Sequence, residues 1–325
     1  MRLKFPTLIL TLLIATACVT APAAPPKGVK VDRDIAYVPG GDPAEVLDLY
    51  LPETPSEKPL PLIVSIHGGG WRAGSKNNPW LAGLANQGYV VASVEYRFSN
   101  KALFPAQIQD CQAAIRWLRA NAKKYNIDPG HVGVWGDSAG GHLVALLGTS
   151  GGKKAFPPIG GNEDQSDRVQ AVCDWYGPTD FNTVMAQAAA DEANIKSSIK
   201  WNTKDDPYSG LIGVNLGSDK EKGEVVSPVH YASKDTPPLL IMHGTKDSLV
   251  PLAQSEELVA ALKKAGDDNV ILQKFPGSGH GGPAFFLPAA RNLVKAFFDK
   301  NLKGMDVKVE VLPDSEVTVK PPSSK

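Results

Sequence analysis

Residues 136–141 read Gly136-Asp137-Ser138-Ala139-Gly140-Gly141. The stretch directly follows an apolar run at 132–135 and directly precedes an apolar helical pattern at 142–147. A serine between two glycines at such a strand-to-helix junction is the pattern of a nucleophile elbow, a sharp turn that lifts the hydroxyl above the edge of a sheet. Glycine is expected at both ends because a side chain there would collide with neighbouring backbone. The pattern therefore predicts a nucleophile at Ser138, with an inert glycine-rich turn as the alternative.

Around this stretch, short β-branched runs alternate with longer helical patterns. Apolar residues recur at helical spacing from about Pro105 to Tyr125, and 255–265 and 289–302 show the same pattern. Alternation of strand and helix predicts an α/β fold with a mostly parallel central sheet and helices on both faces. We expect buried strands at residues 62–66, 90–94, 132–135, 169–173, 239–242 and 270–272, preceded by an antiparallel pair at 34–38 and 46–51.

The two ends of the chain differ from the α/β pattern. Arg2 and Lys4 precede an apolar run, and small residues follow at 21–23, so residues 1–23 are interpreted as an export signal. The sequence before Cys18 resembles a lipoprotein cleavage box, so a periplasmic or secreted protein and a lipid-anchored one both remain open. We expect a single domain over 24–304, an insertion at about 181–233 that borders the site, and a flexible tail over 305–325.

Composition excludes several classes of protein. The 325 residues carry 34 Lys and Arg against 34 Asp and Glu, and loss of the signal leaves the mature chain weakly acidic. Without a basic stripe there is no electrostatic case for nucleic-acid binding. Three cysteines are too few for a disulfide scaffold. Cys111 and Cys173 could pair after export, although buried free thiols are the favoured interpretation. Histidines and cysteines lack metal-ligand spacing, so no cofactor is expected.

A second glycine-rich motif, His67-Gly68-Gly69-Gly70-Trp71, follows the strand expected at 62–66. Consecutive glycines let backbone N–H groups approach a ligand closely. We expect the N–H groups of Gly69, Gly70 and Ala139 to form an oxyanion hole. A phosphate-binding loop is disfavoured because no Lys-Ser/Thr pair follows. His67 is expected to support the loop.

Two further loops follow the last two expected strands and carry Asp247 and His280. A serine hydroxyl needs a neutral imidazole beside it, and the imidazole needs a carboxylate to fix its tautomer. Ser138, Asp247 and His280 therefore form the expected catalytic triad, in the chain order of α/β-hydrolases. Asp180 also follows a strand and is the alternative acid, with capping of the next segment as its favoured role.

Together, these motifs resemble the α/β-hydrolase superfamily, in particular its HGGG-type serine esterases. The Asp-Ser-Ala-Gly-Gly elbow resembles the hormone-sensitive-lipase branch. Further stretches at 48–52, 104–107, 114–119 and 175–180 resemble bacterial bifunctional feruloyl and acetyl-xylan esterases, and the similarity runs from about Asp32 to Leu302. The resemblance implies an α/β-hydrolase fold, here without an N-terminal cap domain, and carries the same triad and oxyanion donors over to this chain.

The resemblance implies a serine carboxylic-ester hydrolase that acts on short-chain or aryl esters, such as acetyl or feruloyl groups on plant polysaccharide. The partner would be a small-molecule or polysaccharide-linked ester, with membrane contact only through a lipid at Cys18. We expect Trp71 and Trp175 to edge the pocket, with core packing as the alternative for Trp175. Alternative functions are an exported lipase, a peptidase of the prolyl-oligopeptidase type, and a non-enzymatic binding protein on a hydrolase fold.

Overall fold

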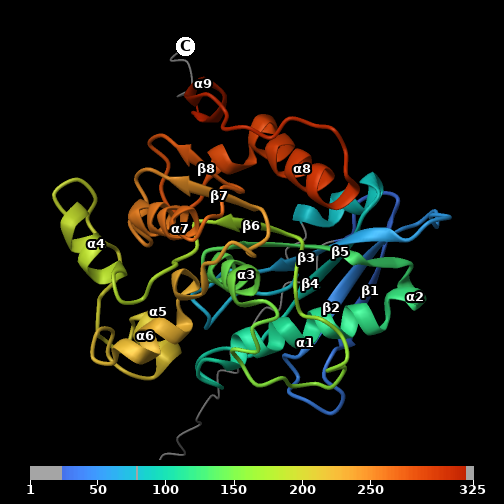
Figure 1. The fold of residues 1–325 in the computed structure, drawn as a ribbon, viewed down its shortest axis with the longest axis horizontal. Coiled ribbons are helices and arrows are strands. Elements are labelled where there is room, and N and C mark those ends of the chain that lie inside the picture. The colour runs from blue at the N-terminus through green and yellow to red at the C-terminus, as the bar shows by residue number, and fades with distance from the viewer. Residues whose placement is uncertain (1–23, 78–79, 320–325) are drawn as a thin grey trace, which may run out of the picture.

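A computed structural model describes residues 24–77 and 80–319 and contains an eight-stranded sheet (Figure 1). The strand order is β1-β2-β4-β3-β5-β6-β7-β8. Strands β3 to β8 run parallel, whereas β2 pairs antiparallel with both β1 and β4. The strands are β1 (Val29–Ala36), β2 (Val46–Pro52), β3 (Leu60–Ile66), β4 (Val90–Val94), β5 (Ile127–Asp137), β6 (Ala171–Trp175), β7 (Leu239–Gly244) and β8 (Val270–Phe275).

Helices cover both faces of the sheet and form two apolar cores. Residues of α1, α3 and α7 build the core on one face, and residues of η1 and α8 build the core on the other. Both faces are covered, so the central strands are mostly apolar, and β4, β6 and β7 are buried at every position. The elements on the two faces are α1 (Ala106–Ala120), α2 (Ala122–Tyr125), α3 (Ala139–Ser150), α7 (Leu252–Lys264), η1 (Trp80–Gln87) and α8 (Pro288–Lys303).

The expected parallel sheet is confirmed, with shifts at some boundaries. The first strand is Val29–Ala36 and not 34–38, because its alternating burial fits an edge strand that begins earlier. The helix expected from about 105 to 125 is divided at Asn121 into α1 and α2. The Asn121 side chain donates to the Trp117 carbonyl, which favours termination of α1 at that point.

The insertion (residues 181–233) contains short helices and, within the described chain, no strand. Figure 1 shows α4, α5 and α6 together at one end of the sheet. Asp206 accepts from the Tyr208 N–H and Asp219 from the Lys222 N–H, so side-chain caps begin two of the helices. The elements are α4 (Val184–Asp191), α5 (Pro207–Ile212), α6 (Lys220–Val226) and η2 (Pro228–Tyr231).

The C-terminal segment differs from the flexible tail that the sequence predicts. Residues 305–319 follow α8, and the short helix α9 (Asp314–Val317) ends on Val317, which is fully buried. The Leu312 N–H donates to Gln273 Oε1 of β8 at 2.6 Å. The expectation was wrong for 305–319, because apolar residues spaced among polar ones reach the core between β8 and α8.

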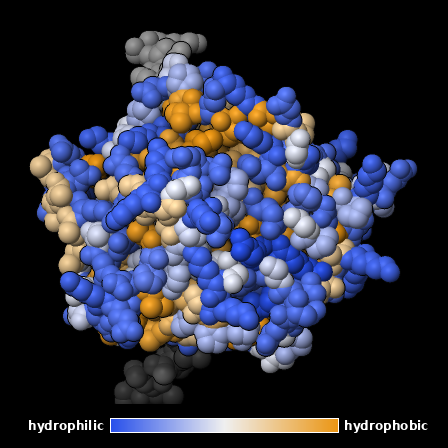
Figure 2. Space-filling model, in the orientation of Figure 1, coloured by the Kyte–Doolittle hydropathy of each residue, from blue (hydrophilic) through white to orange (hydrophobic). Residues whose placement is uncertain are grey.

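Hydrophobic side chains in this C-terminal segment also reach the surface. Figure 2 shows a largely hydrophilic face with hydrophobic residues gathered near the C-terminal end. Within the C-terminal segment, Met305, Val311 and Val319 are exposed. Among the described residues, no helix has the length and apolar character needed to cross a membrane. The expected export signal and Cys18 lie outside the described residues and stay predictions.

We expect Gly140→Ala to destabilise the protein by about 3 kcal/mol or more, because the new Cβ has no space. It would lie 2.1 Å from the Ile66 carbonyl oxygen and 2.7 Å from that of His67, both of them backbone atoms. Gly210→Ala in α5 is the matched control, since a Cβ at that position would have no neighbour within 4 Å. The control should gain roughly 0.5–1 kcal/mol from helix propensity. Urea unfolding measures both changes, and equal stabilities would contradict the prediction.

Candidate active site

The turn between β5 and α3 holds Ser138 in a left-handed conformation. Its φ is 54° and its ψ −118°, an unusual backbone for a residue other than glycine. The Ser138 N–H donates to the Trp175 carbonyl at 2.8 Å, which ties the turn to the end of β6. A Cβ at Gly136 would lie 2.3 Å from the Gly140 carbonyl oxygen, so both glycines are required for the turn to close.

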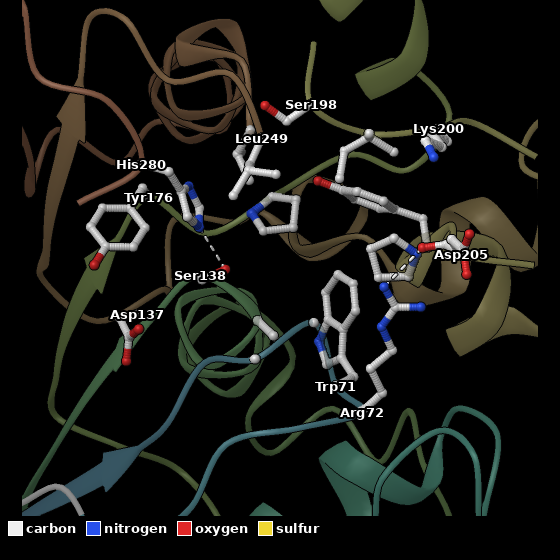
Figure 3. A pocket seen from close by; sticks show the side chains of 18 residues that line it. Trp71, Arg72, Asp137, Ser138, Tyr176, Ser198, Lys200, Asp205, Leu249 and His280 are labelled. Atoms are coloured by element: carbon white, nitrogen blue, oxygen red, sulfur yellow. Dashed lines mark hydrogen bonds between the residues drawn. The ribbon is translucent and has the colours of Figure 1, made fainter. Parts of the chain in front are cut away.

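The structure brings Ser138, His280 and Asp247 together at the carboxyl ends of β5, β7 and β8. His280 Nε2 lies 2.8 Å from Ser138 Oγ (Figure 3). On the other side of the ring, His280 Nδ1 lies 2.7 Å from Asp247 Oδ2. With a proton on Nδ1, His280 donates to the carboxylate and accepts from the serine hydroxyl. In this arrangement the imidazole can take the hydroxyl proton as Ser138 attacks.

Asp247 is held as a buried carboxylate. Its Oδ1 accepts from the N–H groups of Leu249 and Val250 at 2.8 and 2.9 Å. Burial alone would raise its pKa, but hydrogen bonds from His243 and His280 hold the pKa of Asp247 well below its usual range. The group therefore stays ionised at neutral pH and can stabilise an imidazolium at His280.

His243 contacts Asp247, and the sequence analysis did not predict this contact. Its Nε2 lies 3.3 Å from Asp247 Oδ2 and donates to the Val250 carbonyl at 2.9 Å, while its Nδ1 accepts from Ser255 Oγ at 2.7 Å. The spacing of four residues between His243 and Asp247 across a strand-end turn was the available signal.

Asp180, the alternative acid, makes no contact with His280. Its Oδ1 accepts from the Asn182 N–H at 2.7 Å, and its own N–H donates to Gln254 Oε1 at 2.8 Å. It shapes the turn before α4, whose N-cap is Thr183. Asp180 therefore caps the turn that opens the following segment, as expected, and α4 itself begins at Val184 after Thr183.

The loop after β3, residues 67–74, is named the oxyanion loop. Gly69, Gly70 and Trp71 have φ values of 111°, 60° and 57°, so three consecutive residues are left-handed. A Cβ at Gly69 would lie 2.1 Å from the Ala73 carbonyl oxygen. Gly69, Gly70 and Ala139 line the same cavity as Ser138. In the described chain, no protein acceptor takes a hydrogen bond from their N–H groups, which leaves these donors for a ligand.

His67 stabilises the oxyanion loop through contacts with Gly68, Glu95 and Tyr96. Its ring nitrogens lie 2.7 Å from the Gly68 carbonyl oxygen and 2.8 Å from Glu95 Oε1. The ring also stacks on Tyr96 with centroids 4.6 Å apart. These contacts place His67 in the support of the loop and away from Ser138.

The two tryptophans expected at the pocket edge lie in different places. Trp71 lines the cavity beside Ser138. Trp175 is fully buried in the η1/α8 core, where it stacks on Trp80 and meets Trp135 edge-on. The expectation for Trp175 was wrong, because alternation along β6 turns its side chain to the sheet face, while the serine lies beyond the strand ends.

The cavity around Ser138 has a volume of about 580 Å³ and combines apolar walls with polar groups. The insertion and the loop after β7 supply walls that the sequence analysis did not resolve to residues. Figure 3 shows the labelled side chains around Ser138, with Arg72 bonded to the Asp205 carbonyl. The lining residues are Gly69, Gly70, Trp71, Arg72, Asp137, Ser138, Ala139, Tyr176, Pro178, Ser198, Ile199, Lys200, Asp205, Pro207, Tyr208, Leu249, Val250 and His280.

Tyr176 is a second residue near the site that the sequence did not single out. Its ring centroid lies 4.6 Å from that of His280, and its φ is 45°. The Tyr176 N–H donates to the Met242 carbonyl at 2.9 Å, which fixes the turn after β6. Burial raises its pKa far above the usual range, so the phenol stays protonated beside His280.

The described residues contain neither a cluster of potential metal ligands nor a disulfide bond. Their His, Cys, Asp and Glu side chains do not gather in groups of three or more that could hold a metal ion. Cys111 and Cys173 are both buried and free, and burial raises the pKa of each thiol.

A mostly parallel sheet with a serine, histidine and aspartate at its carboxyl ends defines the serine hydrolases of the α/β-hydrolase fold. Within that class, residues 47–262 match the BD-FAE family, and the chain belongs to this family.

Several relatives of the chain are named as esterases. The chain is 30% identical to Esterase LipC of Mycobacterium tuberculosis (strain ATCC 25618 / H37Rv) over 253 residues, which cover 77% of this chain and 59% of LipC. It thus spans less than two thirds of the length of that relative.

Two solved structures are similar to the chain in both fold and sequence. A truncated carbohydrate esterase from gut microbiota has a TM-score of 0.73 and 31% identity, with 84% of this chain and 96% of that one covered. The bifunctional GH43-CE of Bacteroides eggerthii has the same TM-score of 0.73 and the same identity of 31%. The match covers 84% of this chain and 35% of that one. The α/β-hydrolase fold is therefore confirmed.

Proposed function

We propose that this chain is a serine carboxylic-ester hydrolase with Ser138 as nucleophile, His280 as base and Asp247 as the supporting acid. The observation that carries the proposal is the hydrogen-bonded chain from Asp247 through His280 to Ser138, which opens into a cavity lined by Gly69, Gly70 and Ala139. Nucleophile, base and free backbone donors thus face one space, as acyl transfer requires.

The reaction proceeds in two halves. His280 Nε2 takes the Ser138 proton as Oγ bonds to the ester carbonyl carbon, and the N–H groups of the oxyanion loop and Ala139 stabilise the oxyanion. His280 then protonates the leaving alkoxide as the C–O bond breaks, which leaves an acyl-enzyme. Water, deprotonated by His280, attacks the acyl carbon, and return of the proton to Ser138 releases the acid.

The proposed substrates are short-chain or aryl esters, such as acetyl or feruloyl groups on plant polysaccharide. Three observations support this class: membership of the BD-FAE family, similarity to structures titled as carbohydrate esterases, and the form of the cavity. The rings of Trp71 and Tyr208 offer apolar faces, whereas Arg72, Lys200 and Asp205 offer polar groups at the same space. Aromatic faces with nearby hydrogen-bonding groups suit an aryl acid or a sugar ring.

A panel of esters tests this proposal. We expect higher kcat/KM on acetyl, butyryl and feruloyl esters, and on acetylated xylan, than on long-chain triglycerides. The control is the same chain after its serine has reacted with a fluorophosphonate, which should abolish all turnover. Preferred cleavage of long-chain triglycerides would make the protein a lipase, and cleavage of peptides alone would make it a peptidase. Absence of a fluorophosphonate adduct on folded protein would contradict the esterase proposal itself.

A further inference from the structure

His142 lies one helical turn after Ser138 and is completely buried. Its ring nitrogens have one partner each. Nδ1 accepts from the Trp71 indole Nε1–H at 3.2 Å, and Nε2 contacts the Val226 carbonyl oxygen at 2.7 Å. A carbonyl can only accept, so the proton of the neutral ring sits on Nε2. One tautomer satisfies both contacts, and the imidazole thereby links the oxyanion loop to the end of α6.

The environment keeps this imidazole neutral. Burial lowers the pKa of His142 to about 4, although the bond to the Val226 carbonyl acts in the opposite direction. A neutral ring keeps a lone pair on Nδ1, which the indole N–H of Trp71 requires. A protonated ring would set two N–H groups against each other at this contact.

Trp71 needs such an anchor because its backbone is unfavourable. It is a bulky residue at φ 57°, directly after two glycines that also have positive φ. Conformations of this kind persist only where the surroundings fix them. The Trp71 carbonyl accepts from the Ser99 N–H at 2.7 Å, so the backbone is held on one side and the indole N–H on the other.

Packing around the indole supports the hydrogen bond but cannot replace it. The ring lies 5.6 Å from that of Phe181 and 5.5 Å from that of Tyr208, and it meets His142 edge-on at 5.3 Å between centroids. Apolar contacts hold a ring in a volume without a strong preference for the direction of its N–H. The contact with Nδ1 is directional.

We propose that His142 is a positioning residue for the oxyanion loop: by accepting from Trp71 it holds Gly69 and Gly70 with their N–H groups toward the cavity. The inference rests on the proposed esterase function. Three residues of this assembly, Phe181, Tyr208 and Val226, belong to the insertion, so the insertion shapes the loop as well as the cavity wall.

Substitutions that remove one partner at a time test the proposal. His142→Met removes the acceptor with a side chain of similar size, Trp71→Phe removes the donor, and His142→Gln keeps both an acceptor and a donor. We expect about 10- to 100-fold lower kcat for His142→Met and for Trp71→Phe, somewhat less than the loss of a whole oxyanion donor. KM should change little in His142→Met, whose side chain lies outside the cavity lining, and His142→Gln should recover most of the loss.

The double variant and a distant control separate positioning from damage. Two changes that break one contact should not add, so Trp71→Phe/His142→Met should have the kcat of the worse single variant. Trp117→Phe, in α1 against Tyr125, should keep wild-type kcat. Additive losses, or an equal loss in His142→Gln, would overturn the proposal in favour of a general packing role.

Hydrogen exchange gives a readout that does not need turnover. Backbone amides of residues 67–74 should exchange faster in His142→Met and Trp71→Phe than in wild type and His142→Gln, at temperatures well below each melting midpoint. Unchanged exchange in His142→Met would overturn the proposal. If the wild type hydrolyses no ester, the proposed function fails, but the exchange measurement still decides whether His142 holds the loop.

Discussion

Ser138→Ala is expected to lower kcat on an acetyl or feruloyl ester by about 10⁴- to 10⁶-fold and to abolish labelling by a fluorophosphonate. The Ser138 hydroxyl, 2.8 Å from His280 Nε2, is the group that becomes acylated. Among the described residues, no other nucleophilic side chain forms a hydrogen bond with this nitrogen. Thermal unfolding should change little, because the backbone bond from residue 138 to the Trp175 carbonyl is kept. Ester hydrolysis and mass spectrometry of the labelled protein measure the two effects.

Ser198→Ala is the matched control for this variant. Ser198 lines the same cavity, but its hydroxyl bonds to Ser248 Oγ at 2.8 Å and not to a histidine. Labelling should therefore survive in Ser198→Ala, with kcat within a few-fold of wild type. Residual turnover of Ser138→Ala above about one hundredth of wild type would show that the nucleophile has been misassigned.

Asp247→Asn is expected to lower kcat by about 10⁴-fold at neutral pH. An amide at this position can donate to His280 Nδ1, which favours the tautomer with its proton on Nε2, where it no longer accepts from Ser138. The amide also removes the charge that stabilises an imidazolium. Steady-state kinetics on a butyryl ester measures the loss.

Asp180→Asn tests the alternative acid under the same conditions. Its Oδ1 accepts from the Asn182 N–H, a bond that an amide oxygen keeps, so activity should stay close to wild type. If Asp180→Asn lost more activity than Asp247→Asn, the assignment of the acid would be reversed. The pair of variants thus compares the two carboxylates that the sequence offered.

Much of the site could be predicted because its parts are short and local. The turn at 136–141 and the turn with glycines at 68–70 are each built from a few consecutive residues. Local sequence determines turns of this kind. The order of Ser138, Asp247 and His280 then indicates one site, because the carboxyl ends of parallel strands meet at one edge of a sheet.

The rest could not be predicted because it depends on contacts between distant residues. His142 contacts Trp71, 71 positions away in the sequence, and Val226, 84 positions away. The sequence around these three residues contains no pattern that predicts the contacts. The C-terminal segment alternates apolar with polar residues, a pattern that does not show where it packs. Val317 is buried because it meets the η1/α8 core, which forms only in the folded chain.

The sequence by itself determined the class of fold, the nucleophile turn and the identity of the residues that meet there, since all three follow from local patterns and chain order. Only the tertiary structure decided that Trp71 faces the cavity while Trp175 packs in the core, and that His142 and the insertion reach the oxyanion loop. The physical reason is that side-chain direction at a strand end, and contacts between remote segments, depend on how the layers pack against each other.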